Sequence, residues 1–207
     1  SNQQILFFDS EGKVYSLPGH VLPSARGQGE PLTGKLNPAE GALFEAVVGG
    51  EPEQLVLLAC DAGYGFIAKI ADLYVKNRNG KACIRLPDAS NILPPRILPK
   101  HDELFVACAT SAGRLLIFSA KEVPELSRGK GNKLISIPSA KAAAREEYVI
   151  DLQVLSADDS LTVHAGKRHF TLKGADLEHY KGERGRRGNR LPRGLQNVTQ
   201  LQVITSE

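Results

Sequence analysis

The chain repeats a pattern of short strands about every 50 residues, and this period constrains the fold more than any other feature. Four tight turns carry a central glycine, and these glycines are 51, 50 and 53 residues apart: Gly12, Gly63, Gly113 and Gly166. A run of apolar residues precedes each turn, at 5–8, 55–60, 104–109 and 161–164. Because glycine adopts positive φ without steric cost, each turn predicts a β-hairpin at the same stage of a repeat.

Two further strand-like segments follow each hairpin. The third strands are predicted at 32–36, 82–86, 133–137 and 190–195, and the fourth strands at 42–49, 91–98, 148–155 and 198–204. Only 139–147 has the alanine-rich composition of a helix, and we expect it on the outside. Four strands in each repeat predict an all-β, propeller-like array whose units bury their faces by stacking. We expect a single domain over 1–207, with repeats at roughly 4–50, 51–100, 101–156 and 157–207.

A loop rich in glycine and basic residues lies before the third strand of each repeat. These Gly-Arg loops are RGQG (26–29), RNGK (78–81), RGKG (128–131) and RGRRGNR (184–190). Exposed backbone N–H groups together with guanidinium groups bind phosphate. Four such loops at equivalent places on a curved array predict a positive track for duplex DNA. The loops hold no interleaved aromatic residues and no recognition helix is present, which disfavours single-strand stacking and base readout.

The basic residues of these loops are the candidate DNA contacts. The first group contains Arg26, Arg78, Lys81, Arg128, Lys130, Lys133, Arg184, Arg186, Arg187, Arg190 and Arg193. A second group on hairpins contains Lys69, Arg114, Lys167 and Arg168, which face either the same edge or only solvent. The loops RNGK and RGQG are also compatible with ordinary turns. The rival interpretation is a protein-interaction propeller whose basic edge docks an acidic partner.

Charge and composition support binding and give no sign of catalysis. The formal net charge is only +3, but residues 167–193 hold nine basic and three acidic side chains, whereas residues 1–50 have a net charge of −2. The five histidines are scattered and no nucleophile, phosphate-loop or metalloprotease motif occurs, so we expect no catalytic residue, metal or cofactor in this domain. The three cysteines, each in an apolar run, predict buried free thiols in a reducing compartment.

Several stretches resemble the C-terminal domain of the A subunit of bacterial topoisomerase IV, in order from Gln4 to Val203. They are SARGQGEPLTGKL (24–36), DAGYGFIAKIADL (61–73), RNGKACIRLP (78–87) and RGKGNKLISIPSA (128–140). The resemblance implies a β-pinwheel, in which blades exchange strands, that binds and bends duplex DNA along its outer rim without catalysis. It places the DNA-cleaving tyrosine, ATP and Mg²⁺ in other parts of the enzyme.

The resemblance also implies partners and a cellular place. They are the N-terminal part of the same polypeptide and the B subunit of the enzyme, in an A2B2 complex in the cytoplasm on the nucleoid, with the isolated domain a monomer. The related A subunit of gyrase carries a Gln-Arg-Arg-Gly-Gly-Lys-Gly box, which is absent here, and this departure favours an enzyme that decatenates and relaxes DNA. Four repeats predict four four-stranded blades, either open or part of a larger ring. The start SNQQILFF lacks the features of a signal peptide, no membrane span is expected, and we expect the chain to begin inside a longer polypeptide.

Overall fold

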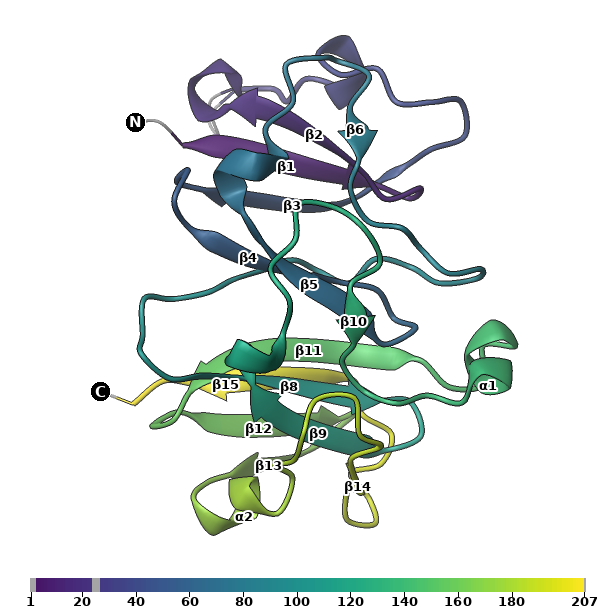
Figure 1. Cartoon of the computed structure of the whole chain (residues 1–207), viewed down its shortest axis with the longest axis vertical. Coiled ribbons are helices and arrows are strands. Elements are labelled where there is room, and N and C mark those ends of the chain that lie inside the picture. Colours follow the sequence, from purple (N-terminus) through teal and green to yellow (C-terminus); the bar gives the residue numbers. More distant parts are fainter. Residues whose placement is uncertain (1–2, 24–26, 207) are drawn as a thin grey trace.

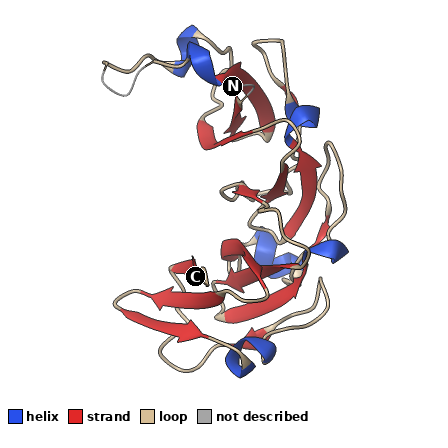
Figure 2. Cartoon of the chain, turned by 90° about the vertical axis from the view of Figure 1, so that its left-hand side faces the viewer, coloured by secondary structure: helices blue, strands red, loops and turns tan. Residues whose placement is uncertain are grey.

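Four small antiparallel sheets follow one another along the chain and stack into an open arc (Figures 1 and 2). The computed structural model describes residues 3–23 and 27–206. The first three sheets have four strands and the fourth has three. Figure 2 shows that the first and last sheets stand at opposite ends of the arc and do not meet. The predicted all-β fold is therefore confirmed in its open form.

The spatial order of strands in each sheet differs from their order in the sequence. The first sheet contains β3 (Phe44–Gly50), β1 (Gln4–Asp9), β2 (Lys13–Pro18) and β6 (Lys81–Ala82). The second contains β10 (Asn132–Lys133), β5 (Tyr64–Lys69), β4 (Leu55–Ala59) and β7 (Arg96–Ile97). The third contains β11 (Val149–Ser156), β8 (Leu104–Thr110), β9 (Arg114–Ser119) and β14 (Asn189–Arg190). The fourth contains β13 (Arg168–Leu172), β12 (Ser160–Ala165) and β15 (Gln200–Ile204).

Helices are short and lie in the connections between strands. The 3-10 helices are η1 (Gly19–Val21), η2 (Leu32–Gly34), η3 (Ile70–Leu73) and η4 (Ala120–Glu122). The α-helices are α1 (Ser139–Ala143) and α2 (Ala175–Glu178). Helix α1 falls within the predicted helix 139–147 and contains no buried residue, as expected for a helix on the outside.

The outer strand of each complete sheet comes from the next repeat. Strand β6 pairs with β2, β10 pairs with β5, and β14 pairs with β9, and the paired residues are 67 to 76 positions apart in the chain. Neighbouring repeats are therefore tied together by shared ladders as well as by packing. This exchange is the feature that separates a β-pinwheel from a propeller with self-contained blades.

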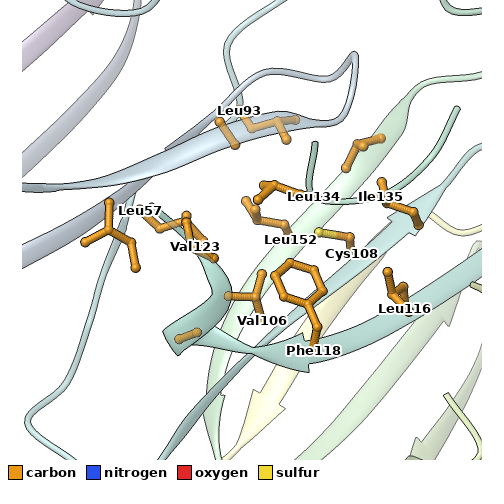
Figure 3. Packing of buried hydrophobic residues seen from close by; sticks show 14 of the residues in the cluster. Leu57, Leu93, Val106, Cys108, Leu116, Phe118, Val123, Leu134, Ile135 and Leu152 are labelled. Carbon is orange, nitrogen blue, oxygen red and sulfur yellow. The ribbon is translucent and has the colours of Figure 1, made fainter. Parts of the chain in front are cut away.

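Apolar clusters fill the spaces between neighbouring sheets. In β4, Val56 and Leu58 pack toward the first sheet, whereas Leu57 and Ala59 pack toward the third. Figure 3 shows the second of these clusters, in which Leu57 and Val106 come from different sheets. Because side chains alternate across a strand, a sheet with both faces buried needs an uninterrupted apolar run. This explains the composition of segment 55–60.

The prediction of a third strand at 32–36 is wrong. This segment forms η2 and folds over the free face of the first sheet, where Leu36 is 2% exposed and packs with Phe7 and Tyr15. Outer strands pair with the preceding sheet, and the described residues contain no sheet before the first. The segment instead covers an apolar face that stacking leaves open. The fourth sheet has three strands for the same reason, because the described residues contain no later repeat that could supply its outer strand.

Other third and fourth strands are shorter than predicted. Strands β6, β10 and β14 have two residues each, and after them the chain leaves the hydrogen-bonded ladder. The predicted strand 91–98 is reduced to β7 and one bridge between Ile92 and Cys60. Pro94 and Pro95 interrupt it because proline has no N–H to donate to a ladder.

Replacing Gly131 with alanine is expected to destabilise the fold by about 2–4 kcal/mol. Gly131 has φ +78°, and a Cβ there would lie 1.9 Å from the carbonyl oxygen of Gly65 on the neighbouring strand. The matched control is Gly166→Ala, where φ is +65° and nothing lies within 4 Å of the added Cβ. Backbone strain alone costs about 1–2 kcal/mol at this control position. Urea unfolding of both variants measures the difference, and equal losses would show that the strand-to-strand approach is not tight.

All three cysteines are free and buried, as the sequence predicts. Burial raises the pKa of the Cys83 thiol to about 12 and raises the pKa values of the Cys60 and Cys108 thiols as well. These thiols are therefore protonated and unreactive in the folded protein. Within residues 3–23 and 27–206, no helix has both the length and the apolar character needed to cross a membrane.

Candidate nucleic-acid interface

The third Gly-Arg loop is bonded to the outer strand segment of the preceding repeat. At this first junction, between the first and second sheets, the Gly129 N–H donates to the Cys83 carbonyl (2.8 Å). The Arg85 N–H in turn donates to the Gly129 carbonyl (3.0 Å). The loop that leads into β10 thus lies directly beside the segment that follows β6.

The same arrangement recurs at the second junction, between the second and third sheets. The Gly185 N–H donates to the Leu134 carbonyl (2.8 Å), and the Ser136 N–H donates to the Arg186 carbonyl (2.9 Å). The segments 78–86, 128–136 and 184–190 therefore form one hydrogen-bonded edge across three sheets, which we call the rim. In Figure 1 its strands β6, β10 and β14 follow one another down the same side of the molecule.

Six of the predicted contacts have exposed side chains that form no hydrogen bond or ion pair with the part of the chain that the structure describes. They are Arg128, Lys133, Lys167, Arg168, Arg190 and Arg193. Arg128, Lys133 and Arg190 belong to the rim. Lys167 and Arg168 lie at the hairpin of the fourth sheet, and Arg193 follows the rim in the chain. Arg26 lies outside the described residues.

Two predicted contacts in the second loop hold neighbouring backbone. The Arg78 guanidinium donates to the carbonyls of Lys35 (2.8 Å) and Gly34 (3.0 Å). The Lys81 ammonium donates to the carbonyls of Asp72 (2.9 Å) and Tyr74 (3.2 Å). Both side chains remain exposed, so these bonds position the charges and leave part of each accessible.

Three further candidates each have a partner within the protein. The Lys130 ammonium lies 4.3 Å from the centre of the Tyr64 ring, and the Lys69 ammonium lies 3.8 Å from Glu53. The Arg114 guanidinium donates to the Gly188 carbonyl (3.1 Å). Burial lowers the pKa of Arg114, and the nearby positive charges of Arg187 and Arg190 lower it further. Arg114 therefore lies close to two guanidinium groups of the fourth loop.

The fourth loop is partly neutralised by the protein itself. Arg186 pairs with Glu183 (2.9 Å), an exposed contact, and Arg184 donates to the Lys133 carbonyl (2.7 Å). Arg187 points inward and forms a bidentate pair with the carboxylate of Glu147 (2.7 and 2.5 Å). Sequence reasoning gave these arginines most weight, yet their side chains are less free than those at the first junction.

Arg85 is a rim cation that sequence reasoning missed. Its side chain is exposed and forms no hydrogen bond or ion pair with the described part of the chain. It lies in the segment predicted as a strand, 82–86, and not in a Gly-Arg loop. Since β6 has only two residues, Arg85 belongs to the irregular segment beside Gly129. The sequence feature that could have pointed to Arg85 is its place as the one charged residue in the otherwise apolar run ACIRL (82–86).

The histidine pair of the fourth sheet is part of the sheet surface. His164 and His169 are cross-strand partners with ring centres 5.8 Å apart, and His164 Nε2 lies 2.8 Å from Gln202 Oε1. Among residues 3–23 and 27–206, no group of three or more His, Cys, Asp or Glu side chains is placed to hold a metal ion.

Sheets that exchange their outer strands and present a basic rim define the β-pinwheel domains of type IIA topoisomerases. A family model described as the DNA gyrase C-terminal domain, beta-propeller, matches residues 54–92 and 105–156. The structure of the Escherichia coli ParC C-terminal domain superposes with a TM-score of 0.90 at 44% identity, covering 100% of this chain and 83% of that one. The chain belongs to the family of C-terminal domains from the A subunit of topoisomerase IV.

Curated relatives agree with this assignment. The DNA topoisomerase 4 A subunit of Pseudomonas aeruginosa is 54% identical over 98% of the chain, and that of Haemophilus influenzae is 50% identical over 99%. The chain spans 27% of the length of both relatives.

Proposed function

We propose that this chain binds duplex DNA along the rim, without reading its sequence, and bends it. The observation that carries the proposal is the continuous hydrogen-bonded edge with unpaired cations along its length: Arg85, Arg128, Lys133 and Arg190. Cations on a rigid edge release counterions from DNA when they neutralise its phosphates, which favours binding to any sequence. Because the sheets form an arc, a duplex that follows the rim must curve, at an elastic cost that the contacts offset.

In the full enzyme, we propose that the domain guides DNA segments for ATP-dependent strand passage, both in decatenation and in relaxation of supercoils. Strand cleavage, ATP and Mg²⁺ are assigned to parts of the enzyme outside this chain, and no cofactor is proposed for residues 1–207, treated as one DNA-binding domain. The proposed partners are the N-terminal part of the same polypeptide and the B subunit of the enzyme, in an A2B2 complex on the nucleoid. The isolated domain is proposed to be a monomer.

Binding to duplexes of increasing length, from about 50 to 200 mM salt, tests the DNA-binding proposal. The expected result is affinity that grows with duplex length, falls steeply with salt and is the same for unrelated sequences. Affinity that is independent of length would contradict a rim-wide contact and favour the rival, a docking edge for an acidic protein.

Replacing Glu183 with glutamine is expected to strengthen DNA binding a few-fold. The carboxylate neutralises Arg186 on the rim, and both side chains are more than 70% exposed, so the pair adds little to stability. Releasing Arg186 for a phosphate increases the salt dependence by up to about 0.9 in the log–log slope. Fluorescence anisotropy over the same salt range measures both quantities, and an unchanged slope would show that Arg186 does not reach DNA.

A further inference from the structure

A cavity of about 650 Å³ lies at the first junction, where the rim passes from the first sheet to the second. Its walls come from both sides of the junction and from the first hairpin turn: Ser10, Glu11, residues 82–86, Ser90, Arg128 and Gly129. Arg85 and Arg128 are its two positively charged lining residues. Both side chains are exposed and unpaired among the described residues, and the cavity brings them into one site.

The backbone fixes these two arginines beside each other. The bond from the Arg85 N–H to the Gly129 carbonyl (3.0 Å) and the bridge between Ile84 and Gly129 align the two segments. Arg85 and Arg128 therefore project from adjacent segments held in register. Two guanidinium groups that share one cavity repel each other unless an anion lies between them, and their planar forks match the oxygens of a phosphate.

The second junction lacks this pair. There the equivalent backbone bond joins Ser136 to Arg186, so a serine occupies the place of Arg85. The nearby Arg187 is withdrawn from the surface by Glu147 and also donates to the Ser136 carbonyl (3.1 Å). The first junction is thus the place on the described rim where two arginines remain unneutralised on facing segments.

We propose that Arg85 and Arg128 form a clamp for one backbone phosphate of duplex DNA. The clamp rests on the proposed function, because it places a particular phosphate at a particular point of the rim. A duplex that follows the rim from Arg190 on the third sheet past Lys133 on the second and on toward the first sheet passes over this junction. The two arginines grip a single phosphate from both sides of the junction, which holds the duplex in register where the rim bends from one sheet to the next.

Glu11 gives the clamp a measurable electrostatic signature. Its carboxylate lines the same cavity and forms no ion pair with the residues that the structure describes. A negative charge on the wall opposes an incoming phosphate. Glu11→Gln is therefore expected to tighten DNA binding a few-fold. If Glu11 only supported the fold, its replacement would not increase the affinity for DNA.

The test is the salt dependence of duplex binding by Arg85→Ala, Arg128→Ala and the double variant. Each neutralised phosphate contributes about 0.9 to the log–log slope. If both arginines hold one phosphate, the double variant lowers the slope by about 0.9 in total. A fall of about 1.8 would mean two separate phosphates and would overturn the clamp. Thermal unfolding checks that the variants remain folded, which is expected because both side chains are exposed and unpaired.

Two comparisons separate failure of the clamp from failure of DNA binding itself. If Lys133→Ala lowers the slope and the double variant does not, the clamp is wrong and the rim still binds DNA. If the unmodified chain shows no salt-dependent duplex binding, the proposed function is wrong, and the clamp proposal is wrong as well. Pyrophosphate added at the concentration of DNA phosphate is expected to compete weakly. Strong competition that Arg85→Ala abolishes would identify a site for a small free phosphate compound and overturn the DNA assignment.

Discussion

Replacing Glu147 with alanine is expected to lower the free energy of unfolding by about 3–5 kcal/mol, the usual cost of removing one member of a buried ion pair. Glu147 is 1% exposed and accepts hydrogen bonds from Arg187 (2.7 and 2.5 Å) and from Thr110 (2.8 Å). Without the carboxylate, the guanidinium keeps its charge among partly buried neighbours. For a chain of this size the melting temperature should fall by about 10 °C.

The exposed pair between Glu183 and Arg186 supplies the control. Removing Glu183 should change stability by less than about 0.5 kcal/mol, because both side chains are solvated. Thermal and urea unfolding of the two variants make the comparison. Equal stability of the Glu147 and Glu183 variants would show that the buried pair does not hold the fourth loop.

The same pair makes stability depend on pH in a defined direction. Burial by itself raises the pKa of Glu147, but hydrogen bonds from Arg187 and Thr110 and the charge of Arg187 more than offset it, so the pKa is lowered in the folded protein. The stabilisation is therefore complete above the pKa of an unfolded glutamate and is lost as pH falls through the lowered folded value. Unfolding of the Glu147→Ala variant should be correspondingly less sensitive to acid.

Removing the four unpaired rim cations together should produce the largest loss of DNA binding. The variant combines Arg85→Ala, Arg128→Ala, Lys133→Ala and Arg190→Ala. With the first two sharing one phosphate, three phosphate contacts disappear and the log–log salt slope falls by about 2.7. If the variant and the unmodified protein bind DNA equally at 1 M salt, this difference in slope makes the variant bind about a hundredfold more weakly near 0.15 M salt.

Lys100→Ala is the control for loss of positive charge away from the rim. Lys100 lies in the connection that follows β7, at the opposite edge of the second sheet from β10, and should have little effect. The four rim side chains have no partners in the described structure, so their removal should leave the melting temperature nearly unchanged. Undiminished binding by this folded variant would show that the rim is not the DNA-binding edge.

The sequence predicted the repeats, the hairpins and the fold class because these depend on local signals. A glycine at each turn and an apolar run before it define where a hairpin forms, whichever sheet it joins. The fate of a third strand depends on the repeat before it. Segments 133–137 and 32–36 both follow a Gly-Arg loop and were both predicted as third strands. In the structure, 133–137 begins at the end of β10 beside the second sheet, whereas 32–36 covers the open face of the first.

The rim was predicted at the level of segments and less well at the level of side chains. Spacing placed the loops at equivalent stages of each repeat, and backbone bonds join them into one edge. Spacing could not show that Arg187 turns inward, because its partner Glu147 lies 40 residues earlier in another repeat. Nor could it single out Arg85, because its neighbour in the proposed clamp, Arg128, lies 43 residues later in the chain and is brought to the same cavity by strand exchange.

Site-directed cross-linking tests most directly whether DNA lies on the rim. A photoactivatable group on a single introduced cysteine reports contact, and the native thiols do not interfere because they are buried and protonated. Lys133→Cys places the group on the rim, and Lys100→Cys places it at the opposite edge of the same sheet. We expect efficient cross-linking of a duplex from position 133 and little from position 100. Equal cross-linking from both positions, or more from position 100, would contradict DNA binding along the rim.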